Sequence, residues 1–172
     1  TVDVTRGPKA SGGGSIAIGA DAVANGENTI ALGGAYDGSA YVSSVANGTN
    51  TLAVLGGKTG YNAEYADTPL PTTSAIALGG AIDGNDFVSS TANADYSLAL
   101  LGGVTGDVDT DPTAAKNSLA IGLGSVTKGA NTVAVLGGVT TEDAENSLAV
   151  GAGAETQGMY TMALGYGYDA SG

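Results

Sequence analysis

The sequence predicts an all-β fold, a parallel β-solenoid or β-roll of about nine coils with two short strands in each coil. Three observations predict it: a short motif repeated at a base period of 14 residues, an excess of glycine and a scarcity of large aromatic residues. Glycine supplies 30 of the 172 residues, whereas phenylalanine occurs once and tryptophan not at all. A conventional core of this size would use more aromatic side chains, which supply much of the buried area.

The repeated motif has the form small–aliphatic–Ala–aliphatic, as in "SLAI" at residues 118–121. Successive copies are 14, 22, 24, 22, 21, 14, 15 and 14 residues apart. A 14-residue unit is too short to hold a strand–helix–strand crossover, so the chain must coil directly from strand to strand and stack parallel to itself. The central alanines of the nine copies are Ala17, Ala31, Ala53, Ala77, Ala99, Ala120, Ala134, Ala149 and Ala163.

A second short segment follows the motif and predicts the second strand of each coil. It alternates small residues with a variable one and occurs at residues 22–26, 44–48, 90–94, 125–129 and 154–158. Period-two alternation is typical of strands, and the glycines that usually end the segment permit the positive φ of a sharp corner. The variable position changes from Val23 to Val126 to Glu155, so we expect it to face water and its small neighbours to face the interior.

Four long intervals and one interval of 15 interrupt the regular period. The long intervals predict insertions over residues 34–43, 57–73, 80–89 and 103–115, whose structure the sequence leaves open. Residues 33–60 match residues 79–106 at 17 of 28 positions, so one insertion is duplicated together with its flanking coils. The interval of 15 is attributed to one extra residue, Leu136, which resembles Leu55 and Leu101 in its setting. We expect Leu136 to share the alanine face and to strain a thin interior unless a bulge at the corner makes room.

Two packings are compatible with the motif. Either the large aliphatic residues point into the roll, or alanine points in and the aliphatic residues form an outer face. The glycine and alanine content favours the second, thin-interior packing. Such an outer face is too apolar for a monomer, so this packing makes oligomerisation obligatory. The expected interface residues are Ile16, Ile18, Leu52, Val54, Leu119, Ile121, Val133, Val135, Leu148 and Val150.

Composition and charge argue against several classes of function. The net charge is −12 with only five basic residues, which disfavours nucleic acid and anionic membranes as partners. Histidine and cysteine are absent, so neither a Ser–His nor a Cys–His nucleophile can be built. The acidic residues lie outside the repeated strand core. We therefore expect a protein that is not an enzyme and needs no cofactor.

The insertions hold most of the candidate binding residues. Loops on a rigid scaffold often carry binding, and aromatic side chains are common anchors at binding surfaces. The alternative is that these side chains only pack their insertion onto the roll, especially Tyr41 and Phe87, which occupy equivalent places in the duplication. The candidate ligand contacts are Tyr36, Tyr41, Tyr61, Tyr65 and Phe87.

Two acidic motifs resemble calcium sites only weakly. Asp107, Asp109 and Asp111 alternate as in a calcium loop, but Pro112 and Ser118 stand where glycine and glutamate belong. The sequences "GGAYDG" and "GGAIDG" lack the spacing of a calcium-binding nonapeptide and indicate turns instead. We therefore predict solvated loops and no metal.

The motifs "SIAIG" at residues 15–19, "NSLAIG" at 117–122 and "NSLAVG" at 146–151 resemble the head repeats of trimeric autotransporter adhesins, the YadA-like family. The second segment "AVANG" at residues 22–26 is similar to the same consensus. The resemblance implies a left-handed parallel β-roll in a homotrimer, displayed on the outer membrane surface of a Gram-negative bacterium. It also implies adhesion, with virulence as its context and a host matrix protein or cell-surface receptor as the partner.

The family's stalk and membrane anchor are not in this sequence. We therefore expect residues 1–172 to form a single repeat domain, the head fragment of a longer surface protein that reaches the membrane only through an anchor outside it. Two other functions stay open. The head could be a structural spacer with no ligand of its own, or an ice-binding solenoid. The second needs a regular threonine ladder, and threonine is irregular here.

Overall fold

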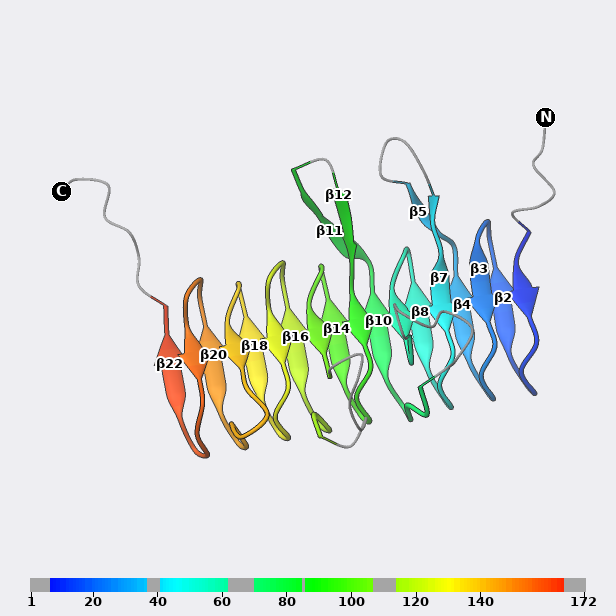
Figure 1. The fold of residues 1–172 in the computed structure, drawn as a ribbon. Helices are drawn as coiled ribbons and strands as arrows, with labels where there is room; N and C mark the ends of the chain where they lie inside the picture. The colour runs from blue at the N-terminus through cyan, green and yellow to red at the C-terminus, as the bar shows by residue number, and fades with distance from the viewer. Residues whose placement is uncertain (1–6, 37–40, 62–69, 85, 107–113, 166–172) are drawn as a thin grey trace.

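The computed structural model describes residues 7–36, 41–61, 70–84, 86–106 and 114–165. In this part of the chain the strands form two nine-stranded parallel sheets, stacked face to face, and two short antiparallel hairpins (Figure 1). No helix occurs among the described residues, and so none is long and apolar enough to cross a membrane. The predicted all-β class with stacked parallel strands is confirmed.

The first sheet, which we call the motif sheet, is built from the nine copies of the repeated motif. The second, which we call the companion sheet, contains the second strand of each coil. The motif sheet consists of β2 (Ile16–Ile18), β4 (Ile30–Leu32), β8 (Leu52–Val54), β10 (Ile76–Leu78), β14 (Leu98–Leu100), β16 (Leu119–Ile121), β18 (Val133–Val135), β20 (Leu148–Val150) and β22 (Met162–Leu164). The companion sheet consists of β1 (Lys9–Ala10), β3 (Ala22–Ala24), β7 (Ser44–Ala46), β9 (Lys58–Thr59), β13 (Thr91–Ala92), β15 (Val104–Thr105), β17 (Val126–Thr127), β19 (Val139–Thr140) and β21 (Glu155–Thr156).

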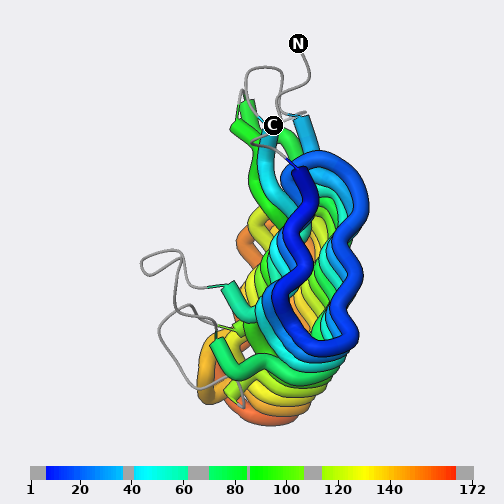
Figure 2. The backbone as a smooth tube through the Cα atoms, turned by 90° about the vertical axis from the view of Figure 1, so that its right-hand side faces the viewer, coloured from blue at the N-terminus to red at the C-terminus, as the bar shows by residue number. Residues whose placement is uncertain are grey.

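The sequence repeat is also the register of the motif sheet. Each central alanine pairs with the central alanine of the next coil, as Ala120 does with Ala134 and Ala134 with Ala149. The aliphatic residues on either side stack on their own equivalents. With strands about 4.8 Å apart, nine of them span about 40 Å along the stack. The end-on view shows the two strand layers lying close together (Figure 2).

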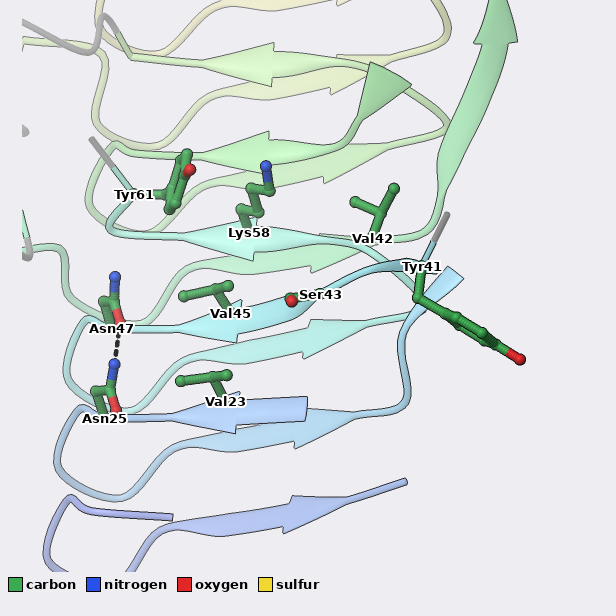
Figure 3. A pocket seen from close by; sticks show the side chains of 9 residues that line it. All are labelled: Val23, Asn25, Tyr41, Val42, Ser43, Val45, Asn47, Lys58 and Tyr61. Carbon is green, nitrogen blue, oxygen red and sulfur yellow. Dashed lines mark hydrogen bonds between the residues drawn. The ribbon is translucent and has the colours of Figure 1, made fainter. Parts of the chain in front are cut away.

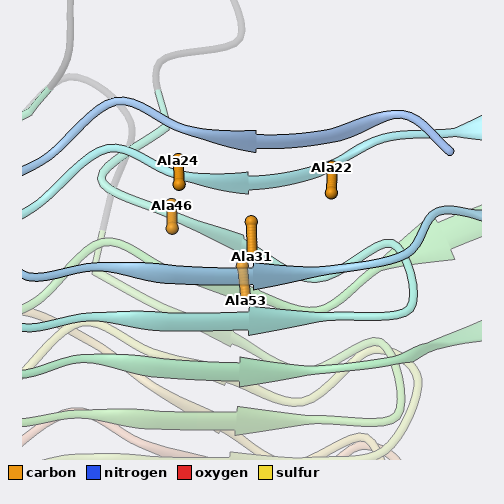
Figure 4. Packing of buried hydrophobic residues seen from close by; sticks show 5 residues of the cluster. All are labelled: Ala22, Ala24, Ala31, Ala46 and Ala53. Atoms are coloured by element: carbon orange, nitrogen blue, oxygen red, sulfur yellow. The ribbon is translucent and has the colours of Figure 1, made fainter. Parts of the chain in front are cut away.

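The interior between the two sheets is thin and is filled by small side chains. The central alanines from Ala31 to Ala149 are fully buried, and they face the buried alanines of the companion sheet, as Ala31 and Ala53 face Ala22 and Ala24 (Figure 4). Leu119 and Ile121 flank Ala120 but stay half-buried, because the period-two alternation points them to the outer face. The thin-interior packing predicted from composition is therefore confirmed.

Buried hydroxyl groups also cross this interior in pairs. The Thr59 hydroxyl donates to Thr51 Oγ1 at 2.9 Å, and Thr140 donates to Thr132 Oγ1 at 3.1 Å. Thr132 in turn donates to the carbonyl of Gly129 at 2.7 Å. Each pair links the two sheets within one coil, so these buried hydroxyl groups hydrogen-bond across the interior. Thr156 Oγ1, in the last coil, is buried with no such partner.

One corner of each coil depends on a left-handed backbone. The third residue before each central alanine has a positive φ, and asparagine occupies this place in five coils, for example Asn117 with φ of 56°. Asparagine tolerates this region better than most residues, which explains the first letter of "NSLAIG". Gly26, two residues before Asn28 in the same corner, is restricted by contact with the next coil. A Cβ at Gly26 would collide with the carbonyl oxygen of Gly48.

Two of the four expected insertions are antiparallel hairpins. They are formed by β5 (Ala35–Tyr36) with β6 (Tyr41–Val42), and by β11 (Gly80–Asp83) with β12 (Asp86–Ser89). Both leave the roll at the corner that follows a motif strand and project from the same edge of the stack (Figure 1).

The other two expected insertions are partly regular. Residues 57–73 begin with β9 and residues 103–115 begin with β15, and both strands continue the companion sheet in register. The assignment of these whole ranges to insertions was therefore wrong. The pattern was hidden because these strands are "KT" and "VT" after two glycines, as β19 also is, and lack the Ala or Ser that opens the five companion segments found in the sequence.

The expectation for Leu136 was also wrong, both in its position and in its role. Three residues join Val135 to Val139, whereas four join Ile121 to Val126, so the corner with Leu136 is shorter than its neighbour. The two additional residues of this coil lie at the opposite corner, between Thr140 and Leu148. Leu136 has a φ of 54° and its side chain is 67% exposed, so it does not enter the alanine interior.

We predict that Ala120→Leu destabilises the roll. A leucine there must push apart two sheets that are separated by alanine and threonine side chains, and overpacking of this kind costs about 1–3 kcal/mol. The free energy of unfolding in denaturant measures the effect. Val126→Leu is the matched control, because it enlarges an outward side chain in the same coil and should change stability little. Equal stability of the two variants would contradict the thin interior.

Candidate functional site

The outer face of the motif sheet is one continuous apolar surface. Among the expected interface residues, Ile16 and Ile18 at the end of the stack are 48% and 60% exposed, and the other eight are half-buried by their neighbours along the ladder. All ten residues lie on this face, and no other part of the described chain covers it. The geometry leaves a large apolar area open to a partner.

The outer face of the companion sheet is more varied. We expected its central column to face water, and the column does point outward, but five of its nine members are half-buried valines. Lysine, threonine or glutamate replaces valine in the other coils. In order along the sheet the column contains Lys9, Val23, Val45, Lys58, Thr91, Val104, Val126, Val139 and Glu155.

A hollow of about 480 Å³ lies on this face, beside the stem of the first hairpin. It brings together β3, β7 and β9 with the residues that follow them, as Figure 3 shows. Two of the predicted ligand contacts, Tyr41 and Tyr61, line it, although they are 20 residues apart in the sequence. The lining residues are Val23, Asn25, Tyr41, Val42, Ser43, Val45, Asn47, Lys58 and Tyr61.

Lys58 supplies the charge of this hollow. Its Nζ atom lies 4.3 Å from the centre of the Tyr61 ring, a distance at which a cation is attracted to an aromatic face. Partial burial lowers the pKa of Lys58, because desolvation disfavours the charged ammonium form. No acidic side chain is among the described residues that line the hollow, so within this part of the chain the Lys58 ammonium group has no carboxylate partner there.

Amide groups form one wall of the hollow and hold its shape. Ser11 donates to Asn25 Oδ1 at 2.8 Å, and Asn25 Nδ2 donates to Asn47 Oδ1 at 3.0 Å. Asn47 Nδ2 continues the row to the carbonyl of Gly60 at 3.3 Å. A primary amide has two donors and two acceptor lone pairs, so Asn25 retains hydrogen-bonding capacity toward a ligand.

Tyr61 is held in place through its backbone. Its N–H donates to Asn93 Oδ1 at 2.8 Å, and its carbonyl accepts from Asn93 Nδ2 at 2.9 Å. Asn93 is almost fully buried, so this pair of bonds fixes the corner that carries the ring. The backbone position of Tyr61 beside Lys58 is therefore fixed by the fold of the roll.

The other aromatic residues predicted as ligand contacts have different surroundings. The rings of Tyr36 and Tyr41 are cross-strand partners in the first hairpin, 4.9 Å apart, and both are exposed. Phe87 does not line the hollow: a Cβ added to Gly56 would lie 2.8 Å from its ring, so it packs the second hairpin onto the roll, as the alternative expectation had it. Tyr65 lies outside the described residues, and so do Asp107, Asp109 and Asp111.

Lys58 was missed as a site residue, although the sequence carried a signal for it. The duplicated segments share their framework, but Lys58 of the first copy corresponds to Val104 of the second, and Tyr41 corresponds to Phe87. Both copies form the same strands in the same register. The polar members of the first copy are therefore not required by the fold.

Metal binding has no support in the geometry of the described residues. Within those ranges no three acidic side chains come together in a group that could hold a metal ion. The chemistry present in the hollow is one ammonium group, the aromatic ring of Tyr61, amides and valine methyl groups. This set suits recognition of a ligand.

Comparison with protein families matches residues 10–35, 114–135 and 143–167 to the YadA head domain repeat, a family model that describes two copies of the repeat. The chain carries a YadA-like head domain. Heads of this family form homotrimers and belong to trimeric autotransporter adhesins, which are displayed on the outer membrane surface. The family consists of adhesins and not of enzymes, in agreement with adhesion in general.

The match leaves residues 36–113 of this YadA-like head unmatched, although β7 to β15 continue both sheets through them. This part contains the second hairpin, most of the first hairpin and seven of the nine residues that line the hollow, whereas Val23 and Asn25 lie in the matched range. No curated protein and no solved structure matches the chain.

Proposed function

We propose that this chain is the adhesin head of a bacterial surface protein and that it attaches the cell to host or other surfaces. The observation that carries the proposal is the pairing of two features. One is an apolar motif face that a monomer leaves open, and the other is a hairpin-bearing, polar companion face. The first suits assembly into a homotrimer, and the second remains free for contact with a ligand.

In the proposed assembly, three left-handed rolls meet through their motif faces around a common axis. A homotrimer buries the half-exposed aliphatic ladders that the thin interior cannot accept. Residues 1–172 act as one head domain of about nine coils, in a longer protein anchored in the outer membrane. The partner is a host matrix protein or a cell-surface receptor, and the role belongs to virulence.

The alternative is a structural spacer with no ligand of its own. The hollow favours the adhesive function, because a spacer does not need a half-buried lysine that has no carboxylate among the described residues of its lining. An ice-binding role has less support. Only Thr91 in the outward column of the companion sheet is a threonine, so no threonine ladder forms there.

We predict that the double variant Leu119→Asp/Val133→Asp dissociates the trimer. Both side chains lie on the motif face in adjacent coils, and the trimer would bury two carboxylates per chain without a partner. Light scattering at micromolar concentration should give the mass of one chain instead of three.

The matched control is Val126→Asp/Val139→Asp, which places the same charges on the companion face of the same two coils. This control should remain trimeric. A wild-type head that is already a monodisperse monomer would refute the homotrimer, and dissociation of both variants would show that the motif face has no special role.

Adhesion is tested with the isolated trimeric head on matrix proteins and cultured cells. We expect saturable binding of the head, and loss of attachment when residues 7–165 are deleted from the full-length protein while the remainder is displayed normally. A head that binds nothing, together with a deletion that preserves attachment, would leave only the spacer function.

A further inference from the structure

We propose that the hollow between β3, β7 and β9 binds a carboxylate-bearing sugar, with Lys58 pairing with the carboxylate. The proposal rests on the adhesive function for its biological meaning and adds the chemical class of the ligand. It stands on the residues that line the hollow and on the comparison between the two copies of the duplicated segment.

The first step concerns Lys58 itself. The same place in the companion sheet is filled by valine in five coils, so a valine satisfies the fold. Lysine there loses hydration, which is unfavourable unless an anion compensates it. In a chain with a net charge of −12 and five basic residues, this half-buried lysine, which has no acidic group among the described residues of its lining, is suited to pair with an anionic ligand.

The second step concerns the shape of the ligand. Tyr61 offers an aromatic ring, and Val23 and Val45 offer aliphatic surface beside the amide row. The ring of Tyr41 points away from the hollow and contacts Tyr36. Sugar rings combine apolar C–H faces with hydroxyl groups around the rim, and the amide of Asn25 has free capacity to bond those hydroxyls. A hollow with one cation, one aromatic ring and a row of amides therefore fits a single acidic sugar.

The third step excludes a dense polyanion. The ammonium group of Lys58 is the one cationic side chain in the lining, and the rest of the head is strongly acidic. Long-range repulsion therefore opposes a heavily sulfated chain, whereas an isolated carboxylate gains the local pairing at small cost. The hollow also lies on the companion face, so the proposed trimer interface on the motif face leaves it accessible.

The test is a titration of the trimeric head with methyl glucuronide, followed by saturation-transfer NMR, with methyl glucoside as the neutral match. We expect weak, saturable binding of the glucuronide and little of the glucoside. Lys58→Val, which copies Val104 of the second segment, should weaken binding by about tenfold or more. Binding should also fall as the pH rises through the lowered pKa of Lys58, where the ammonium group loses its charge.

Lys116→Val is the matched control, because it removes the same charge from an exposed site elsewhere. It should bind like wild type. Equal binding of the two sugars, or full binding by Lys58→Val, would overturn the proposal. If an acidic peptide binds through Lys58 more tightly than the glucuronide does, the ligand of the hollow is a peptide and the proposed sugar is wrong. The titration measures binding of a small sugar at the hollow. A failed adhesion experiment would therefore contradict the proposed function without deciding whether the hollow binds the sugar.

A second inference rests on a different observation, the strained turns at Leu55, Leu101 and Leu136. Each leucine and the glycine after it have positive φ, for example 52° at Leu101 and 84° at Gly102. A hydrogen bond of 3.0 Å from the Gly103 N–H to the Leu100 carbonyl closes the turn. This is a type I′ turn, whose first central position favours asparagine, aspartate or glycine and is unfavourable for leucine.

Buried serines hold these turns from the preceding coil. Ser44 Oγ accepts from the Gly56 N–H at 2.8 Å, and Ser90 Oγ accepts from the Gly102 N–H at 2.9 Å. Ser125 repeats the contact with Gly137 at 3.0 Å. The strained leucines are therefore built features of the scaffold, although each side chain is more than half exposed.

We infer that these leucines form a ridge that contacts a second copy of the chain in the proposed homotrimer. A strained conformation persists where the side chain it presents is used. The leucines lie at the border of the apolar motif face and recur in every second coil, about 9.6 Å apart. A neighbouring copy has the same spacing of coils along the stack, so it can make equivalent contacts with all three leucines. The intervening coils carry Gly79 and Gly122 at this place.

The test is the double variant Leu101→Asn/Leu136→Asn, since asparagine relieves the strain and removes the apolar contact. The dissociation constant of the trimer should rise by about tenfold or more. In the monomeric Leu119→Asp/Val133→Asp background, the same change should raise the denaturant midpoint. Ile82→Asn, at an exposed hairpin position of ordinary φ, should leave the trimer unchanged. A trimeric variant with an unchanged or lower dissociation constant would refute the ridge, whereas a monomeric wild type would refute the trimer itself.

Discussion

The narrow space between the two sheets is the constraint on which the rest of the structure depends. The inward side chains of the paired strands are Ala, Ser or Thr, so the large side chain on either side of each central alanine must point outward. The interior gains little apolar area from so many small residues, and hydroxyl pairs such as Thr59 with Thr51 hold it together. Stability from larger side chains has to come from the outer faces, which a single roll leaves half open.

The same constraint acts on the corners. Each coil reverses direction twice within a few residues, so at least one residue of each corner adopts a left-handed conformation. Asparagine meets this need before the motif strands. Where no hairpin is inserted after a motif strand, the chain uses either a four-residue corner with glycine or the shorter leucine–glycine turn. In each shorter turn a serine of the preceding coil accepts a hydrogen bond from the glycine N–H. The choice between the two corner types thus depends on the preceding coil.

Insertions at the corners change the surface without disturbing the stack. The two hairpins leave and re-enter between strands that remain in register, so the roll tolerates them. The duplicated segment then diverged in one feature of its surface, with Lys58 and Tyr41 in one copy and Val104 and Phe87 in the other. A repetitive scaffold supports such divergence, because the ladder needs only a strand at each level. Function can therefore be carried by single members of a repeated column.

The sequence by itself determined the parallel β-roll, the register of the motif sheet and the outward direction of the aliphatic residues. These follow from periods of 14 and 2, which are local and visible in one chain. Only the tertiary structure placed Leu136 in a turn, because its direction depends on a φ angle and on Ser125 one coil earlier. Only the tertiary structure brought Tyr41, Lys58 and Tyr61 into one hollow, since each lies in a different segment and the stacking of coils decides which segments meet.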